Sequence, residues 1–468
     1  MKEYSIRELY DLLNQGTLSS KSLVSMYLER IDTYDAKLNS LGDLNIDALQ
    51  IAENLDEERQ KKGPRSLLHG IPIVVKDNIF THDSMRTTAN SYVFNNFYAP
   101  YDATIVKKLK DAGAIILAKA NCSEFAYFMS MGRMPSGFGS MYGQVKHPYN
   151  SKIDPLGSST GSAVAVAANL IPASIGTETN GSLMSPAQQN SIVSIKPTVG
   201  LVSRHGIIPI SRLQDTAGPM SRTVEDSAIL LSVITGKDSH DEATIQASEK
   251  ASDYLKAIQH PPKVNKIGML RFENYPNDKE ENQILEEAKK IFKMLDIEVI
   301  EINYTYDLPS NRETLQHEFK VEMNHFLHSL GVHAPVHSLK EIIDFNLTHY
   351  RRCLKYGQTD LIQSEMTDGR LKSNDYRKQK KALMKSIDHY LSLFVDYELD
   401  ALITTKITGY PAIAGLPSLI IPAKPLITEN PKSLLLIAPK WQEAVMLGLG
   451  HHYEQNTKHR VPPSLKNI

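Results

Sequence analysis

Residues 156–200 read LGSSTGSAVAVAANLIPASIGTETNGSLMSPAQQNSIVSIKPTVG and contain two glycine loops rich in hydroxyl side chains. Between the loops lie an Ala/Val-rich segment typical of a helix and a short apolar segment typical of a strand. Glycine has no Cβ, so such loops allow backbone N–H groups to converge on a ligand. Each loop also carries a serine placed where a nucleophile or a proton relay would be useful.

A lysine lies upstream, at the end of the apolar run in HGIPIVVKDNI. The run before Lys76 has the length and composition of a strand covered on both faces. Burial disfavours the charged ammonium and lowers the pKa of a lysine, so we expect Lys76 to act as a base. Asp77 should not neutralise it, because adjacent side chains of a strand point to opposite faces. Together with the serines of the two loops, Lys76 forms a Ser–Ser–Lys catalytic set, and this combination indicates amide hydrolysis.

The rest of the chain alternates apolar runs of strand length with amphipathic helices. We expect strands at 114–120, 266–272, 297–304, 400–407, 416–423 and 433–439. We expect two helices within 5–36 and further helices at 103–112, 281–295 and 441–457. This pattern predicts an α/β fold with one large sheet. Residues 1–65 are expected to form a helical segment that packs on a catalytic domain over 66–468, and the polar stretch 236–262 has the composition of a linker.

Composition excludes several classes of protein. The 468 residues include 52 Lys and Arg against 53 Asp and Glu, so no basic surface for nucleic acid is expected. Two cysteines, Cys122 and Cys353, argue against a disulfide framework. The N-terminus is not that of a signal peptide, and no apolar run is long enough to span a membrane. We therefore expect a cytoplasmic enzyme.

Two loop motifs have alternative interpretations. GSSTG (157–161) matches a nucleophile elbow centred on Ser159, but the elbow needs a preceding strand, and HPYNSKIDPLG is typical of a turn. GTETNGS (176–182) has the glycine spacing of a phosphate loop but lacks its lysine. What remains is a turn whose N–H groups, from Thr179 to Ser182, are suited to hold an oxyanion.

The middle of the chain carries five histidines: His317, His325, His328, His333 and His337. Their spacing alone is compatible with zinc, but no Cys or Glu cluster with metal spacing accompanies them, so we expect no metal site. We expect a helical cap over the substrate at about 300–395. Within it, aromatic side chains either line the pocket or belong to the core: Phe319, Phe326, Phe345 and Tyr350.

Four motifs occur in an order that resembles the amidase signature family, and within it peptide amidases and related bacterial amidases. They are GIPIVVKDNI, GSSTGSAVAVAA, GTETNGS and RHGIIPISRLQDTAGPMSRTVED. The resemblance covers nearly the whole chain. It implies a single mixed sheet covered by helices on both faces, and an enzyme that hydrolyses carboxylic or peptide C-terminal amides.

The resemblance also implies residue roles. Ser182 would be the nucleophile that forms an acyl-enzyme, Ser158 would relay protons, and Lys76 would be the base and then the acid. The N–H groups of Thr179, Asn180, Gly181 and Ser182 would form the oxyanion hole. No cofactor or metal is implied. The expected partner is a small-molecule or peptide amide, and the expected assembly is a monomer or homodimer.

Some residues depart from the family pattern and leave alternatives open. Asn180 stands where an Asp is common in the peptide-amidase branch, and Thr160 stands where Gly or Ser is usual. These changes motivate a catalytically impaired scaffold as one alternative. The other is the glutaminase component of a glutamyl-tRNA amidotransferase-like complex, which shares the fold and the triad. The leading prediction remains an amidase with a leaving-group side narrow enough for ammonia.

Overall fold

The computed structural model describes residues 2–130, 132, 134–424 and 431–465. Its strands are β1 (Leu41–Leu44), β2 (Pro72–Lys76), β3 (Ile115–Ala120), β4 (Phe138–Gly139), β5 (Gly143–Gln144), β6 (Ala173–Glu178), β7 (Val193–Lys196), β8 (Thr216–Ser221), β9 (Lys266–Phe272), β10 (Glu298–Tyr304), β11 (Ala401–Thr404), β12 (Ser418–Pro422) and β13 (Ser433–Ile437). Eleven of them form one sheet in the order β1-β3-β2-β6-β8-β7-β12-β13-β11-β9-β10, and β4 pairs with β5.

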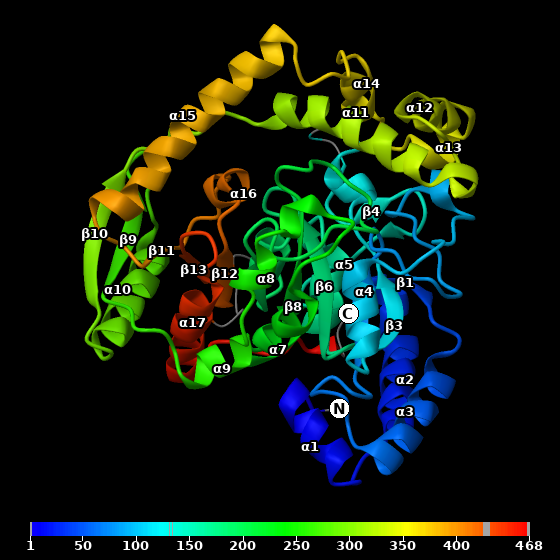
Figure 1. Cartoon of the computed structure of the whole chain (residues 1–468), viewed down its shortest axis with the longest axis horizontal. Helices are drawn as coiled ribbons and strands as arrows, with labels where there is room; N and C mark the ends of the chain where they lie inside the picture. The colour runs from blue at the N-terminus through cyan, green and yellow to red at the C-terminus, as the bar shows by residue number, and fades with distance from the viewer. Residues whose placement is uncertain (1, 131, 133, 425–430, 466–468) are drawn as a thin grey trace.

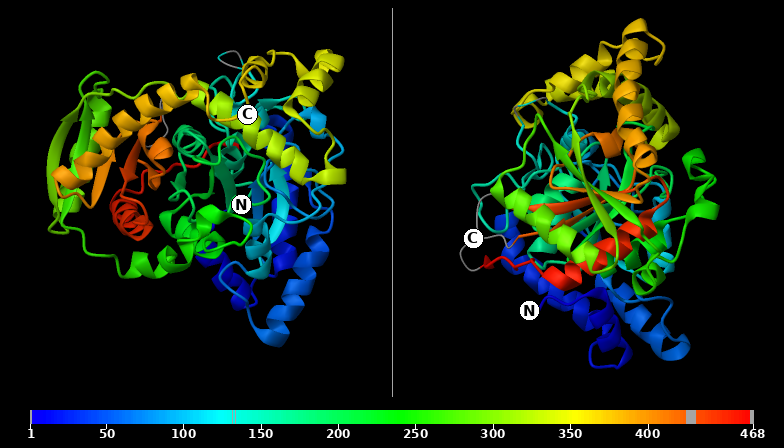
Figure 2. Two further views of the ribbon diagram at one scale, coloured as in Figure 1. Left: turned by 45° about the horizontal axis from the view of Figure 1, so that its top comes forward. Right: turned by 90° about the vertical axis from the view of Figure 1, so that its left-hand side faces the viewer.

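Helices cover both faces of this sheet (Figures 1 and 2). They are α1 (Ile6–Asn14), α2 (Ser20–Leu38), α3 (Ala48–Lys62), α4 (Thr104–Asp111), α5 (Thr160–Ala167), α6 (Met184–Gln189), α7 (Val224–Ile234), α8 (Ala247–Lys250), α9 (Tyr254–Gln259), α10 (Lys279–Lys293), α11 (Arg312–Ser329), α12 (Leu339–Thr348), α13 (Tyr350–Cys353), α14 (Thr359–Glu365), α15 (Asn374–Asp396), α16 (Tyr410–Ala414) and α17 (Glu443–Thr457). Short 3-10 turns lie at Tyr92–Phe94, Glu124–Tyr127, Glu242–Thr244 and Gly331–His333.

The sheet is mixed, with parallel strands near each end. β2 pairs in parallel with β3 and β6, and β9 pairs in parallel with β10 and β11. Between these two groups every neighbouring pair of strands is antiparallel. The predicted α/β fold with a single large mixed sheet is therefore confirmed.

The sequence did not predict β1, β7 or β8. β8 has the sequence TAGPMS, and glycine and proline are rare inside central strands. Pro219 has no N–H to donate to the sheet, but its carbonyl accepts a hydrogen bond of 2.9 Å from the Ser194 hydroxyl of β7. Burial between two strands thus overrides the local signal.

The linker predicted over 236–262 is wrong. This stretch contains α8 and α9, and α9 packs against α7 and α17. Tyr254, the first residue of α9, is buried, and its N–H donates to the Ser232 hydroxyl at 3.1 Å. The segment is polar because most of its other side chains face solvent, not because it is loose.

Two regions flank the catalytic motifs. Residues 1–65 contain α1, α2 and α3, and also β1, the edge strand that pairs with β3. Helices α11 to α14 lie together at the top of Figure 1, and α15 runs from them towards β9 and β10.

Within the described ranges, no helix is both long and apolar enough to cross a membrane.

The sheet topology brings the motifs to one edge. β2 and β6 run parallel, so Lys76 and Glu178, their last residues, lie at the same edge. α5 leads back to the start of β6, so its first turn and the loop before it lie at that edge too. Sites of open α/β sheets form at the carboxyl ends of parallel strands for this reason.

Candidate active site

Lys76 lies at the end of β2 with a fully buried side chain. Its Nζ donates to the Ser158 hydroxyl at 2.8 Å, to the Thr177 hydroxyl at 2.9 Å and to the Thr177 carbonyl at 3.3 Å. No carboxylate of the described chain forms an ion pair with it. Burial without such a partner lowers the pKa of Lys76 to about 8, so a neutral amine is accessible near physiological pH.

Asp77 points away from Lys76, as predicted. Its carboxylate accepts hydrogen bonds from the N–H groups of Thr88, at 3.2 Å, and Asn90, at 2.9 Å, and from the Thr88 hydroxyl. Burial raises the pKa of Asp77 to about 6. The carboxylate therefore organises the loop after β2 and leaves the lysine unpaired.

The first serine loop precedes α5 and contains a cis peptide bond between Gly157 and Ser158. The Ser159 N–H donates to the Ser182 carbonyl at 3.2 Å, which joins this loop to the second one. The Ser159 hydroxyl donates to the Thr177 carbonyl at 2.9 Å and accepts from the Thr177 N–H at 3.1 Å. Ser159 is thus occupied as a bridge to β6, whereas Ser158 contacts Lys76.

The second serine loop connects β6 to α6. Gly181 has a φ of +80°, a conformation that favours glycine. Glu178 accepts hydrogen bonds from the N–H groups of Leu183 at 2.7 Å and Met184 at 3.2 Å, which fixes the far side of the loop. In the described chain, the N–H groups of the four predicted oxyanion-hole residues donate to no protein acceptor: Thr179, Asn180, Gly181 and Ser182.

Ser182 is nearly buried, with about 8% of its surface exposed. Its carbonyl accepts the Ser159 N–H, which ties its loop to the loop that carries Ser158. Among the described residues no hydrogen bond joins the Ser182 and Ser158 hydroxyls. Catalytic hydrogen bonds often tighten only when substrate is bound.

A chain of amide side chains holds the second loop to the cap. Asn180 donates to the side-chain oxygen of Asn311 at 3.3 Å, and Asn311 donates to Gln214 at 3.4 Å. Gln214 in turn donates to the Thr179 carbonyl at 3.0 Å. The Thr179 hydroxyl donates to Asp215 at 2.5 Å. Two residues of the second loop, Thr179 and Asn180, are therefore held by side chains from outside the loop.

Sequence reasoning missed Thr177, Asn78, Gln214, Asp215 and Asn311. Thr177 and Asn78 lie inside motifs that were already assigned to the predicted site. A search of these motifs for every hydroxyl and amide side chain near the lysine would have found them. The other three come from a distant loop and from the start of the cap, and only the fold brings them here.

The predicted cap residues have mixed positions. Phe319 is fully buried and packs against Phe125 and Phe128, so it belongs to the core. Phe326 packs against Phe80, whereas Tyr350 is exposed. Nowhere in the described parts of the chain do three or more His, Cys, Asp or Glu side chains gather as a metal site.

Comparison with known proteins decides the family. The amidase family model matches residues 22–414. A probable amidase of Arabidopsis thaliana is 36% identical over 99% of this chain and 92% of its own length. The chain belongs to the amidase signature family.

Solved structures agree with this assignment. An amidase family protein from Bacillus anthracis superposes with a TM-score of 0.90 at 37% identity, over 98% of this chain and 92% of its own. The native peptide amidase of Stenotrophomonas maltophilia superposes with a TM-score of 0.88 at 34% identity, over 99% of both chains. A glutamyl-tRNA(Gln) amidotransferase subunit from Halorhodospira halophila is 30% identical over 98% of both chains. This amidase signature protein is an amidase, an enzyme that hydrolyses the carbon–nitrogen bond of amides.

Proposed function

We propose that this amidase hydrolyses primary amides of carboxylic acids, or the C-terminal amides of short peptides, and releases ammonia. The observation that carries the proposal is the contact of 2.8 Å between the Ser158 hydroxyl and the buried Nζ of Lys76, which no carboxylate of the described chain neutralises. A lysine whose pKa is lowered to about 8 can take a proton from a serine and later return it.

The proposed reaction uses two half-reactions. Ser182 Oγ attacks the amide carbonyl while its proton passes through Ser158 to Lys76. The oxyanion that forms is held by the N–H groups of Thr179 to Ser182, which donate to no other acceptor of the described chain. The proton then returns through Ser158 to the nitrogen, the C–N bond breaks, and ammonia leaves. Water attacks the acyl-enzyme by the same proton route and releases the acid.

The acyl part of the substrate is proposed to lie under the cap. The cap begins at Asn311, whose side chain touches Asn180 of the second serine loop. Arg312 stacks on Phe128, with its guanidinium 4.3 Å from the ring centroid, and pairs with Asp360 of α14. The start of the cap is thus anchored to the core beside the nucleophile, which suits a roof over an apolar or peptide-like acyl group.

The test is a covalent map followed by a substrate panel. The protein is incubated with a serine-reactive phosphonylating reagent, and the adduct is located by peptide mass spectrometry. We expect the adduct on Ser182, with none after Ser182→Ala and with labelling retained after Ser159→Ala. An adduct on Ser159 would overturn the proposed nucleophile, and a protein that forms no adduct would favour the impaired scaffold. Ammonia release is then measured for peptide amides and for aliphatic and aromatic primary amides.

The relatives among the glutamyl-tRNA(Gln) amidotransferases favour a second candidate, a glutaminase that works within a complex. It predicts that the chain co-purifies with a partner in fixed stoichiometry and hydrolyses glutamine. We propose instead that this protein is a cytoplasmic monomer or homodimer that binds no nucleic acid. Light scattering of the purified protein and a glutaminase assay separate the two candidates.

A further inference from the structure

A pocket of about 290 Å³ lies where residues 3–8 meet residues 454–460, beside the start of α7 and the end of β12. Its polar lining includes Asp226 of α7 and Glu454 of α17. Its apolar lining consists of the side chains of Tyr4, Ile421 and Pro422. The pocket thus combines two carboxyl groups with an apolar wall.

This pocket and the active site lie at opposite edges of the sheet. Glu178, at the catalytic end of β6, pairs with Thr216 of the antiparallel β8. At the other end of the same two strands, Ala173 pairs with Ser221. Arg222, which lines the pocket, follows Ser221 directly. The pocket is therefore separate from the catalytic lysine and serines.

Asp226 leaves one carboxylate oxygen open to the pocket. The residue lies in the first turn of α7 and is fully buried. Its Oδ1 accepts the N–H of Ile6 at 2.8 Å, but its Oδ2 has no hydrogen-bond partner among the described residues. A buried oxygen without a partner costs free energy, so this atom is suited to accept a donor from a ligand.

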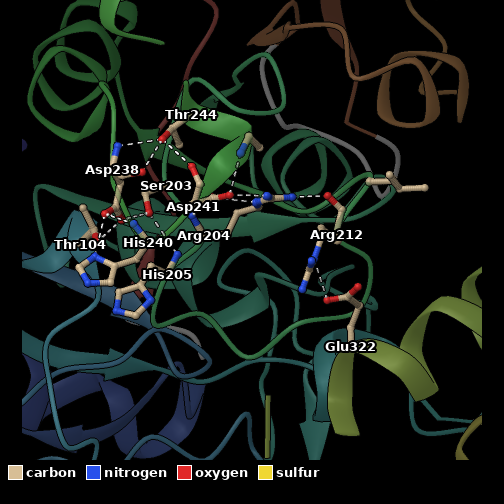
Figure 3. Close-up of polar contacts among 12 residues, drawn as sticks. Thr104, Ser203, Arg204, His205, Arg212, Asp238, His240, Asp241, Thr244 and Glu322 are labelled. Carbon is tan, nitrogen blue, oxygen red and sulfur yellow. Dashed lines mark hydrogen bonds and ion pairs between the residues drawn. The ribbon is translucent and has the colours of Figure 1, made fainter. Parts of the chain in front are cut away.

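The polar cluster in Figure 3 shows the opposite case, a carboxylate whose two oxygens are both used by its own chain. Asp238 Oδ2 accepts from the hydroxyls of Thr104 at 2.5 Å and Ser203 at 2.6 Å. The other oxygen, Oδ1, accepts the N–H of His240 at 2.9 Å. Asp226 differs because only one of its oxygens is used in this way.

A second carboxylate, that of Glu454, lies at the same helix start. It accepts the N–H of Val224, the first residue of α7, at 3.0 Å. Burial, together with the charge of Asp226, raises the pKa of Glu454 to about 8, and burial raises the pKa of Asp226 to about 6. Both carboxyl groups would therefore be stabilised in their charged form by an added cation.

The cations that line the pocket do not supply this charge. Arg222 donates to three backbone carbonyls and to neither carboxylate. Arg460 bonds Glu3 at 2.5 Å, and Lys458 is exposed to solvent. Two carboxylates thus face one buried guanidinium, which leaves one negative charge for a ligand to neutralise.

We propose that this pocket binds a primary alkylammonium ion. Its ammonium group donates to Asp226 Oδ2 and to the carboxylate of Glu454, and its alkyl part lies against Tyr4, Ile421 and Pro422. An ammonium group is a compact cation with three N–H donors, which suits two carboxylates. Across the parts of the chain that the structure describes, no three His, Cys, Asp or Glu side chains converge as a metal site, which favours an organic cation here.

The experiment measures binding of n-butylamine to the full chain by ligand-detected NMR at pH 8 and constant ionic strength. An alkylamine is still an ammonium ion at this pH. Butan-1-ol and sodium butanoate have a similar chain but no positive charge, so they are the matched probes. We expect n-butylamine to bind with a Kd of about 1 mM and the other two not to bind.

Two variants locate the site. Asp226→Asn keeps the acceptor for Ile6, and Glu454→Gln keeps the acceptor for Val224, so both should fold. Each should raise the Kd of n-butylamine at least about tenfold, because each removes a charge-assisted hydrogen bond.

Glu225→Gln is the control, because it removes a charge from the same turn of α7. Glu225 pairs with Arg7 at 2.5 Å and does not line the pocket. We expect this variant to change the Kd less than about threefold.

Every outcome decides for or against the pocket. Binding that survives both Asp226→Asn and Glu454→Gln would place the amine elsewhere and overturn the proposal. Equal weakening by Glu225→Gln, equal binding of butan-1-ol, or no saturable binding of n-butylamine would also overturn it. If circular dichroism shows that one of the two variants is unfolded, the other decides. None of these measurements uses hydrolysis, so the proposed function is tested separately.

Discussion

The two parallel parts of the sheet have the same secondary structure but different environments. All residues of β2 are buried, as are those of β6, and helices and loops cover both faces of these strands. At the other end of the sheet, β10 alternates between buried and exposed residues. Its exposed face carries ion pairs, with Glu301 bonded to Lys289 at 2.8 Å and to Arg271 at 3.4 Å.

The two regions show how position changes the chemistry of one residue type. Glu301 raises the pKa of the partly exposed Lys289, so that lysine stays an ammonium ion. Burial without a carboxylate lowers the pKa of Lys76. The end of β2 differs because Lys76 is fully buried there and no carboxylate of the described chain forms an ion pair with it, and the parallel topology alone does not achieve this.

The largest effect is expected at the nucleophile. Ser182→Ala should reduce kcat by about a millionfold, because loss of the attacking oxygen in such enzymes removes the whole covalent route. Ser159→Ala is the matched control, since Ser159 only bridges to Thr177. It should lower stability and keep measurable turnover. Steady-state kinetics with ammonia detection, together with thermal melts, would measure both; normal turnover by Ser182→Ala would disprove the role.

The second largest effect is expected at Lys76. Lys76→Ala should lower kcat about 10³-fold or more, and Lys76→Arg should be nearly as inactive because a guanidinium does not deprotonate. In the wild type, kcat/KM should rise with pH and level off above an apparent pKa of about 8, since the neutral amine is the active form. A flat profile between pH 6 and 9 would argue against Lys76 as the base.

The same lysine should make stability depend on pH. Its pKa is lower in the folded chain than in the unfolded chain, so the unfolded state binds more protons between about 8 and 10.5. Its contribution to stability therefore rises as pH increases through that window. Lys76→Met should raise the thermal midpoint at pH 7, where the wild type holds a buried charge, and the gain should shrink towards pH 10.5. A variant that is less stable at pH 7 would contradict this.

A smaller effect is expected at Asn180. Asn180→Asp replaces the donor that binds Asn311 with a carboxylate, so the link between the second serine loop and the cap should weaken. We expect up to about tenfold lower kcat/KM and altered relative rates across a panel of peptide and simple amides. Asn311→Asp should restore nothing in this background, because two acids then face each other. Unchanged relative rates would show that position 180 does not influence specificity.

The smallest effect is expected in the C-terminal parallel region. Lys289→Ala removes an exposed ion pair, and such pairs contribute about 0–1 kcal/mol. Activity should remain unchanged within error, and chemical denaturation should show a small loss of stability that disappears in high salt. A large loss of activity would mean that the two ends of the sheet are coupled.

How much could be predicted from the sequence depended on whether the signal was local. Several strands could be predicted because their apolar runs have a strand-like composition: β2, β3, β9, β12 and β13. β8 did not, since its glycine and proline are tolerated only by the strands on either side. The serines and Lys76 were visible within short motifs. Asn311 and Gln214 were not, because only the cap and a distant loop bring them to Asn180 and Thr179.

The strand order also has a consequence for biosynthesis. β7 ends at Lys196, and one of its two neighbours, β12, begins at Ser418. A ribosome that adds about 5–20 residues per second supplies that neighbour about 10–45 s later. During this interval the edge of β7 is an open template for other chains, as unpaired strand edges are. We expect mispairing in a cell to concentrate on this edge until β12 and β13 close the centre of the sheet near the end of translation.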